Sequence, residues 1–394
     1  MSFTTGARTP PHILTLVALG GLGALSMNVF LPSLPGMARD FGVDYGLMQL
    51  SVSAYLAGAA VVQLLAGPIS DRFGRRPVML GALAIFLVSS VGTWAAPTAG
   101  WFLFFRMIQS AIATGMVLSR AVVRDMVAGD AAASRIGYVT MGMSVIPMLA
   151  PVLGGILDEA FGWRANFSML AIAGAAVMAL AWADMGETAR GGGLPMAAQI
   201  RNYPALARSG RFWGYAAAAT LASGAFFAYL GGAPFVGETV FHLRPAEVGY
   251  WFAAPSIGYL AGNFISGRWS MKIGMNRMIL WGAILTVAAL AVALTADLAG
   301  LHHPLMFFGA VAVTGLGNGM VLPNANAGMM SVRPELAGTA SGLGGAMAVA
   351  GGAALAALAG ALLVPGAGAA PLLVIMLLSA VGSLAGVLAL MQAR

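Results

Sequence analysis

The sequence contains no cysteine and few charged residues. Of its 394 residues, 59% are hydrophobic and only 8% are charged, whereas an ordinary soluble domain has about 25% charged residues. The absence of cysteine excludes disulfides, thiolate metal sites and cysteine nucleophiles. With so little charge, a soluble fold of this size could not cover its surface with polar groups. We therefore expect lipid to be the main solvent of the chain.

Three functional signals are also missing. No GxxxxGK[ST] phosphate loop occurs, which argues against ATP as an energy source. No run of five or more basic residues occurs despite the net charge of +7, which argues against nucleic acid as a partner. Catalytic acids, histidines and nucleophiles do not cluster along the chain. We therefore expect no enzyme activity, no cofactor and no metal.

Long apolar segments recur along the whole chain. A helix that crosses a bilayer needs about 20 mostly apolar residues. Twelve such spans are predicted, at 13–35, 47–69, 78–96, 101–122, 136–157, 165–183, 213–236, 246–267, 278–296, 304–327, 336–363 and 369–391. The expected fold is an all-α membrane protein with a six-helix bundle at 1–184, a cytoplasmic linker at 185–212 and a second six-helix bundle at 213–394.

The basic residues favour one orientation of these spans. If the N-terminus lies in the cytoplasm, most of the 20 Lys and Arg residues lie on the cytoplasmic side. Only Arg39, Arg164 and Arg244 lie outside, and Arg106 lies within a span. Because basic residues accumulate in cytoplasmic loops, we predict an even number of spans and two cytoplasmic termini. The expected location is the inner (plasma) membrane of a bacterium.

Two loops of the chain repeat one pattern. Residues 67–76 read GPISDRFGRR, and residues 267–276 read GRWSMKIGMN, with glycine, serine, a basic residue and glycine in the same register. Duplicated halves place a substrate site between them, near the middle of the membrane. The repeat therefore predicts a secondary transporter that works by alternating access.

The loop at 67–76 resembles the cytoplasmic signature of the major facilitator superfamily, G-x-x-x-D-R/K-x-G-R-R/K. The resemblance implies two pseudo-symmetric six-helix bundles and a cytoplasmic gate. The predicted gate residues are Gly67, Asp71, Arg72, Gly74, Arg75, Arg76 and Asp125. In this interpretation Arg75 pairs with Asp125. When the inner side is closed, Asp71 lies at the positive end of the eleventh span, near Thr339.

Further segments resemble the twelve-span drug:proton antiporters of the bicyclomycin and chloramphenicol/florfenicol resistance branch. Residues 28–35 (NVFLPSLP) resemble D-x-Y-L-P-x-x-P, residues 106–109 (RMIQ) resemble R-x-x-Q-G, and residues 119–125 (SRAVVRD) resemble A-R-A-x-V-R-D. The antiporter motif of the fifth span is represented by Pro147, Pro151, Gly154 and Gly155. The resemblance implies proton-coupled efflux of drug-like compounds.

Four positions depart from this pattern. Asn28 stands where the branch has an acid, and Ser110, Ala150 and Met271 replace two glycines and an acid. An amide does not titrate, so Asn28 cannot carry a proton. Three explanations stay open. Protons are coupled through another group, transport is uncoupled or exchanges one solute for another, or the sequence carries an Asp-to-Asn change that traps one state.

Polar and aromatic groups within the spans are the candidates for the substrate and proton cavity. A charge at the bilayer centre costs about 2.5–3.5 kcal/mol, so we expect Arg106 to face a wet cavity or a partner. The alternative is that its side chain reaches back to the membrane surface. The predicted cavity residues are Asn28, Tyr55, Arg106, Gln109, Phe226, Tyr229, Asn263 and Asn318. A hydrogen bond between helices is the competing role of each polar residue.

The charge of this cavity predicts the partners of the protein. Arg106 without a carboxylate would make the cavity positive, which favours a neutral or anionic drug-like substrate over a cationic one. Protons and the lipid bilayer are the other expected partners, and we expect a monomer. The alternative is a transporter of the same fold for one neutral or anionic metabolite, either uncoupled or exchanging.

Overall fold

The computed structural model describes residues 11–126, 130–189, 204, 206, 208–333, 336–364 and 366–392, and these ranges are almost entirely helical. The helices of the first half are α1 (Ile13–Asn28), η1 (Leu31–Ser33), α2 (Leu34–Phe41), α3 (Tyr45–Phe73), α4 (Arg75–Trp94), α5 (Ala99–Gln109), η2 (Ser110–Ile112), α6 (Ala113–Met126), α7 (Asp130–Phe161) and α8 (Arg164–Asp184). Those of the second half are α10 (Gly210–Phe235), the π-helical turn η3 (Val236–Val240), α11 (Pro245–Trp251), α12 (Ala253–Ile273), α13 (Met275–Leu298), α14 (Pro304–Val332), α15 (Ala337–Leu362) and α16 (Ala370–Gln392). The prediction of an all-α protein is confirmed.

The helices coincide with the predicted spans. Within the described ranges, ten helical stretches are long and apolar enough to cross a membrane. The two other predicted spans correspond to α7 and to the consecutive helices α11 and α12. Helices such as α3 extend beyond the predicted apolar run. They can do so because a helix satisfies its own backbone hydrogen bonds inside and outside lipid.

The first span is not one continuous helix. α1 ends at Asn28, and the chain continues through η1 into α2. Pro32 and Pro35 lie in this break, and a proline has no N–H to donate to the carbonyl four residues earlier. The prolines therefore interrupt the span and leave Asn28 at the carboxyl end of α1.

The two repeated loops adopt the same local structure. α3 ends at Gly74, with a φ of 98°, and α12 ends at Gly274, with a φ of 92°. Glycine adopts such positive φ values without the steric cost that a side chain brings. The sequence repeat thus corresponds to two equivalent helix-to-helix corners, one in each half.

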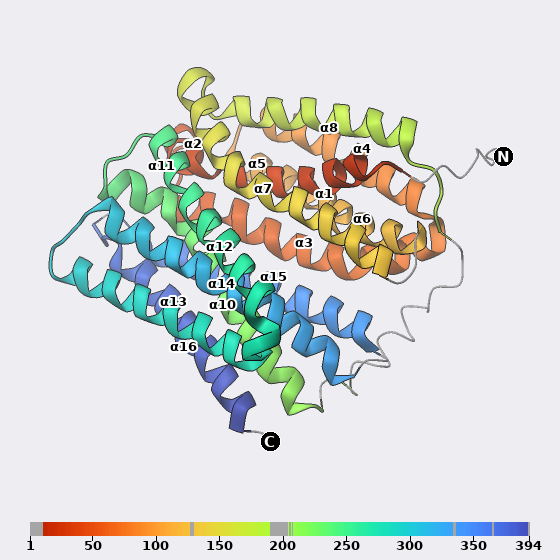
Figure 1. The fold of residues 1–394 in the computed structure, drawn as a ribbon. Helices are drawn as coiled ribbons and strands as arrows, with labels where there is room; N and C mark the ends of the chain where they lie inside the picture. Colours follow the sequence, from red (N-terminus) through yellow and green to blue (C-terminus); the bar gives the residue numbers. More distant parts are fainter. Residues whose placement is uncertain are drawn as a thin grey trace.

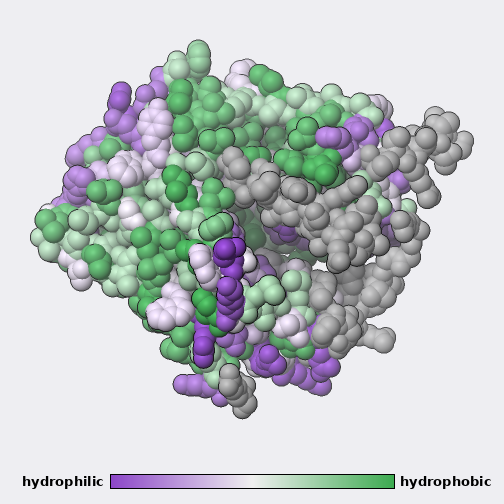
Figure 2. Space-filling model, in the orientation of Figure 1, coloured by the Kyte–Doolittle hydropathy of each residue, from purple (hydrophilic) through white to green (hydrophobic). Residues whose placement is uncertain are grey.

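The halves meet at one end of the molecule. Figure 1 shows α1–α8 and α10–α16 as two groups that lie close together near α2 and α11 and diverge toward the other end. We call the end where α2 and α11 lie the Tyr45 end, and the end where the two groups diverge the Gly74 end. Figure 2 shows the surface hollowed between the groups, beside the residues drawn in grey. The exact division at 184 and 213 stays a prediction, since much of the linker lies outside the described residues.

Glycines bring neighbouring helices into backbone contact. On α12, a Cβ atom at Gly258 or Gly262 would overlap with the carbonyl oxygen of Ala312 or Leu316 on α14. Lipid provides no hydrophobic force between helices, so close packing of small residues has to hold them together.

Gly262→Val is expected to lower the free energy of unfolding by about 3 kcal/mol, because the new side chain would overlap with the α14 backbone. Thermal unfolding of the purified protein in detergent measures the change. Gly81→Val is the matched control, since a Cβ atom at Gly81 on α4 meets no other atom within 4 Å. Equal losses in both variants would contradict the packing argument.

Candidate functional site

Arg106 is the centre of a buried polar cluster in the first half. Its side chain, on α5, is 0% exposed. The guanidinium lies over two aromatic rings, with 4.4 Å from its carbon to the ring centre of Phe30 and 4.0 Å to that of Tyr55. An arginine over two aromatic rings gains electrostatic attraction from both of them. The rings therefore replace part of the hydration that the charge loses.

The N–H groups of Arg106 donate to neutral oxygens. Nη2 donates to the Ser26 carbonyl at 2.8 Å, Nη1 to the Ser26 hydroxyl at 3.0 Å, and Nε to the Ser51 carbonyl at 3.3 Å. Ser26 lies in the last turn of α1, where the helix dipole is negative. The cation is thus stabilised by the carboxyl end of a helix, and each of these acceptors is uncharged.

Gln109 extends the cluster toward α4. Its side-chain oxygen accepts a hydrogen bond from Nη1 of Arg106, and its Nε2 donates to the Ser90 hydroxyl at 2.7 Å. The structure therefore brings together three of the predicted cavity residues, Arg106, Gln109 and Tyr55, whereas their contact with a substrate stays a prediction. The serines at 26, 51 and 90 were missed, because serine is common within membrane helices and no spacing distinguishes these three.

Arg106 finds partners inside the first half and does not reach back to the membrane surface. The alternative of a side chain extended to the surface is wrong for this state, because the whole side chain is buried. Contact with a wet cavity stays a prediction, since protein atoms cover the guanidinium here.

Asn28 lies in the chain between Ser26 and Phe30, two residues that contact Arg106. Its Nδ2 donates to the Ala24 carbonyl of its own helix at 2.7 Å, and the residue is 3% exposed. The amide thus bonds to the last turns of α1, and it takes no part in the hydrogen bonds of Arg106 described above. Its role in the cavity stays a prediction.

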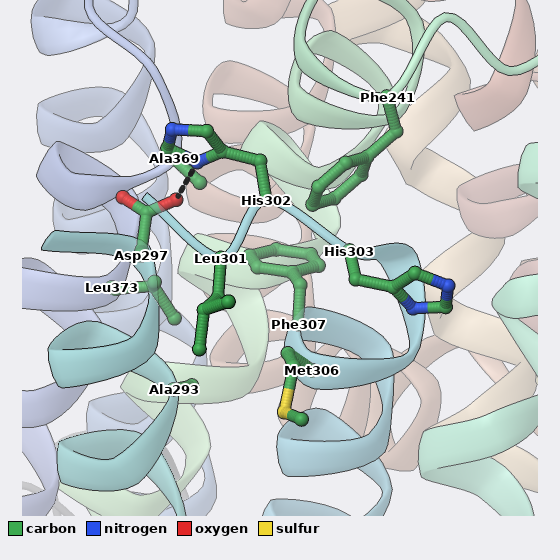
Figure 3. A pocket seen from close by; sticks show the side chains of 10 residues that line it. All are labelled: Phe241, Ala293, Asp297, Leu301, His302, His303, Met306, Phe307, Ala369 and Leu373. Atoms are coloured by element: carbon green, nitrogen blue, oxygen red, sulfur yellow. Dashed lines mark hydrogen bonds and ion pairs between the residues drawn. The ribbon is translucent and has the colours of Figure 1, made fainter. Parts of the chain in front are cut away.

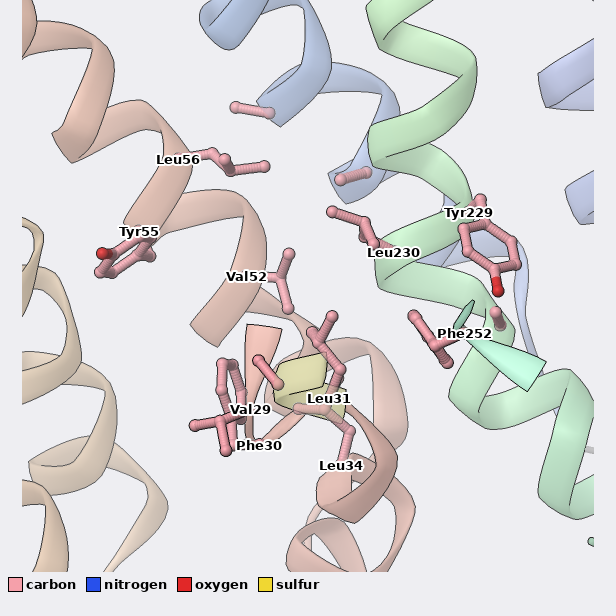
Figure 4. Packing of buried hydrophobic residues seen from close by; sticks show 14 of the residues in the cluster. Val29, Phe30, Leu31, Leu34, Val52, Tyr55, Leu56, Tyr229, Leu230 and Phe252 are labelled. Carbon is pink, nitrogen blue, oxygen red and sulfur yellow. The ribbon is translucent and has the colours of Figure 1, made fainter. Parts of the chain in front are cut away.

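Tyr229 is the corresponding buried group of the second half. Its ring centre lies 5.0 Å from that of Phe252 and 6.2 Å from that of the half-buried Phe226. Its hydroxyl has no hydrogen-bond partner within the described part of the chain, and an unpaired buried polar group costs about 1–3 kcal/mol. Figure 4 shows Tyr55 and Tyr229 pointing away from each other, each into its own half. Their joint contact with a ligand therefore stays a prediction.

The two predicted asparagines of the second half differ in role. Asn318 on α14 donates to the Ala222 carbonyl on α10 at 3.2 Å. Asn263 is half-buried and donates to the Tyr259 carbonyl of its own helix at 2.8 Å. Asn318 thus takes the competing role of a bond between helices, whereas the hydrogen bond of Asn263 stays within α12.

The predicted gate residues gather around Arg75 at the Gly74 end. Nη1 of Arg75 lies 2.6 Å from the Asp71 carboxylate, and Nε lies 2.9 Å from that of Asp125. The predicted Arg75–Asp125 pair is therefore present. Glu187, which the sequence did not point to, accepts hydrogen bonds from the backbone N–H groups of Arg75 and Arg76. It caps the positive end of α4.

The other gate residues surround this ion pair. Asp71 pairs with Arg75 within the first half, and its place beside Thr339 when the inner side is closed stays a prediction. Arg72 is exposed over the Phe73 ring, and Arg76 donates to the Trp182 carbonyl at 2.9 Å. A Cβ atom at Gly67 would meet no atom within 4 Å, so Gly67 has no close neighbour that requires glycine here.

The fifth-span motif lies where α7 crosses the break in α1 and the second half. A Cβ atom at Gly154 would overlap with the Val29 carbonyl, and one at Gly155 would overlap with the Pro245 carbonyl. The residues of this motif are Pro147, Pro151, Gly154 and Gly155. The Pro151 carbonyl also faces Gly249. The residues of the motif that contact other helices at the Tyr45 end are thus Pro151, Gly154 and Gly155. Pro147 is half-buried within α7.

A small pocket at the outer surface of the helix bundle contains a histidine and an acid. His302 Nδ1 lies 3.0 Å from the Asp297 carboxylate, beside Phe241 and Phe307 (Figure 3). Among the residues that the structure describes, no group of three or more His, Cys, Asp or Glu side chains could hold a metal ion.

The sequence matches a known family and several curated proteins. The family model described as Major Facilitator Superfamily matches residues 16–246 and 238–394. An uncharacterized MFS-type transporter of Bacillus subtilis is 31% identical, with 82% of this chain and 81% of the relative covered. The bicyclomycin resistance protein homolog of Haemophilus influenzae is 28% identical, with 86% of each chain covered. The multidrug resistance protein D of Escherichia coli is 28% identical, with 93% and 92% covered.

Solved structures of low sequence identity share the fold. A D-xylose–proton symporter superposes with a TM-score of 0.75 at 16% identity, over 94% of this chain and 96% of that one. The agreement over nearly the full length of both chains confirms the twelve-helix fold class.

Arg106→Lys is expected to lower the free energy of unfolding by about 2–3 kcal/mol, because lysine has fewer donors and no planar face for stacking. Thermal or chemical unfolding in detergent measures this loss. Arg268→Lys, at an exposed position on α12, is the matched control and is expected to change little. Similar values for the two variants would contradict the role assigned to the buried cluster.

Proposed function

The chain belongs to the major facilitator superfamily, and from this premise we propose that it exports small drug-like compounds by alternating access. Relatives named for bicyclomycin resistance and multidrug resistance match most of its length, which supports a drug-like substrate. The observation that carries the proposal is the asymmetry of the fold. The halves are joined at the Tyr45 end and diverge toward the Gly74 end (Figure 1).

The inferred orientation places the Gly74 end in the cytoplasm. Arg72, Arg75 and Arg76 lie at this end, in agreement with the tendency of basic residues to remain inside. With this orientation the described state is open toward the cytoplasm and closed toward the outside. A substrate would enter the hollow between the halves from inside and leave after the Tyr45 end opens.

The inferred substrate is neutral or anionic. The hydrogen-bond acceptors of Arg106 described above are uncharged, so no carboxylate among them is available to pair with a cationic ligand. A cation brought close to Arg106 would lose hydration and be repelled. A transporter of one neutral or anionic metabolite would use the same arrangement, and a broad drug panel separates the two.

Proton coupling requires a group other than Asn28 in this chain, or an acid restored at that position. Asn28 lies at the carboxyl end of α1, two residues after Ser26, whose hydroxyl and carbonyl bind Arg106. A carboxylate placed there would stand in the chain between Ser26 and Phe30, two residues that contact Arg106. It would titrate, which an amide does not do.

Expression in an efflux-deficient bacterial host is expected to raise the inhibitory concentration of a neutral amphenicol severalfold. Arg106→Ala should abolish this protection at equal amounts of protein in the membrane, whereas Arg268→Ala should retain it. Stronger protection against a quaternary ammonium dye than against the amphenicol would contradict the inferred charge preference. No protection against any drug of the panel would favour the single-metabolite alternative.

Asn28→Asp is expected to increase proton-driven uptake of substrate into inverted membrane vesicles, because it introduces a titratable group between two residues that contact Arg106. Uptake is measured with and without an imposed pH gradient. Asn324→Asp, at a buried amide that donates to Ser266 on α12, is the matched control and should show no gain. If Asn28→Asp gains nothing, an Asp-to-Asn change is not what limits coupling in this chain.

A further inference from the structure

Gln49 connects three helices at the Tyr45 end. It lies on α3, is 0% exposed, and extends from the first half between Gly231 on α10 and Gly360 on α15. Both glycines belong to the second half. The side chain therefore occupies a notch that exists only while the halves are in contact at this end.

The notch fits Gln49 because both of its walls are glycine. A Cβ atom at Gly360 would lie 2.8 Å from Cδ and 2.9 Å from Cγ of Gln49, and one at Gly231 would lie 3.3 Å from Cδ. Separations near 3 Å or below are closer than carbon atoms tolerate. Since a wall stands on both sides, Gln49 cannot avoid an added methyl group by moving toward the opposite helix.

Further contacts between the halves surround this notch. The Tyr45 hydroxyl donates to the Gly231 carbonyl at 2.6 Å, and its ring centre lies 5.0 Å from that of Phe235. Arg39 forms an ion pair with Glu238. These groups position α10 against α3 and hold the notch closed around Gln49.

Among the residues that the structure describes, no group forms a hydrogen bond with the amide of Gln49 in the closed notch. Neither Nε2 nor Oε1 is paired, and a buried amide without partners is less stable than one in contact with water. The shape of the side chain thus fits the closed end, whereas its polarity favours an open end that admits water. Shape and polarity act in opposite directions on the same equilibrium.

We propose that Gln49, Gly231 and Gly360 form an adjustable latch that sets the balance between the closed and open states of the Tyr45 end. Gln49 is a positioning residue, because it acts through the contact between the halves. The role of the latch in turnover rests on the proposed function, whereas the balance itself is measurable without any substrate.

Gly360→Ala should open the Tyr45 end, because the three atoms nearest to the added methyl group all belong to Gln49. Gln49→Ala in the same chain removes these atoms and should therefore restore closure. Spin labels on Asp44→Cys and Val364→Cys, both exposed positions flanking the notch, report the separation. The absence of native cysteine makes the labels specific. Gly345→Ala on the same helix, where a Cβ atom meets nothing within 4 Å, is the matched control.

Gln49→Met should shift the populations the other way, toward closure by about tenfold, since it keeps the length of the side chain and removes the unpaired amide. Gln63→Met, on the same helix at a half-buried position, is its control. Failure of Gln49→Ala to rescue Gly360→Ala, or a shift of Gln49→Met toward opening, would overturn the latch.

The outcome for the latch is separable from that for drug export. If the distances respond as expected while no drug is exported, the latch holds and the proposed substrate class is wrong. If drugs are exported while the distances of Gly360→Ala and Gln49→Met match those of the unaltered protein, the latch is wrong and the transport proposal is unaffected.

Discussion

The burial of one arginine without a paired acid constrains the rest of the first half. A buried guanidinium requires acceptors for its N–H groups and cover for its faces. Here the end of α1 provides the acceptors at Ser26, and Phe30, within the break that follows α1, provides part of the cover. Because both come from the interrupted first span, the prolines that break it also determine how the charge is accommodated. The uncharged Asn28 is compatible with this arrangement, since a helix end supplies the negative pole.

The charged and polar groups at the two ends of the molecule are paired in different ways. At the Gly74 end, Arg75 pairs with Asp71 and Asp125 inside the first half. At the Tyr45 end, Arg39 pairs with Glu238 and Tyr45 with Gly231 between the halves. A transporter that alternates has to exchange such contacts between its ends. At the Gly74 end, Arg75 has both of its acidic partners in the first half, so separating the halves there does not break these ion pairs.

Hydropathy and local chemistry were sufficient to predict the spans, the equivalent corners at Gly74 and Gly274, and the neighbourhood of Arg106 and Gln109. They did not predict that the eighth span divides into α11 and α12 beside Pro255, a residue that cannot donate to the carbonyl four positions earlier. They also did not predict the notch of Gln49. Its glycines are far apart in the sequence, and their meaning depends on which helices pack together. Packing of this kind has no local signature.

The cluster around Arg106 and the contact between the halves are joined by a short series of packed backbones. Arg106 binds the end of α1, and the next residues of that break include Val29, whose carbonyl faces Gly154 on α7. Gly155, which follows Gly154 on α7, faces Pro245 at the start of α11 in the second half. The contacts of Gly154 and Gly155 leave no room for even one methyl group. A ligand that displaced the end of α1 would therefore have to displace α7 as well, and with it the surface on which the second half rests. Close packing without side chains is what makes this region stiff enough to transmit such a movement.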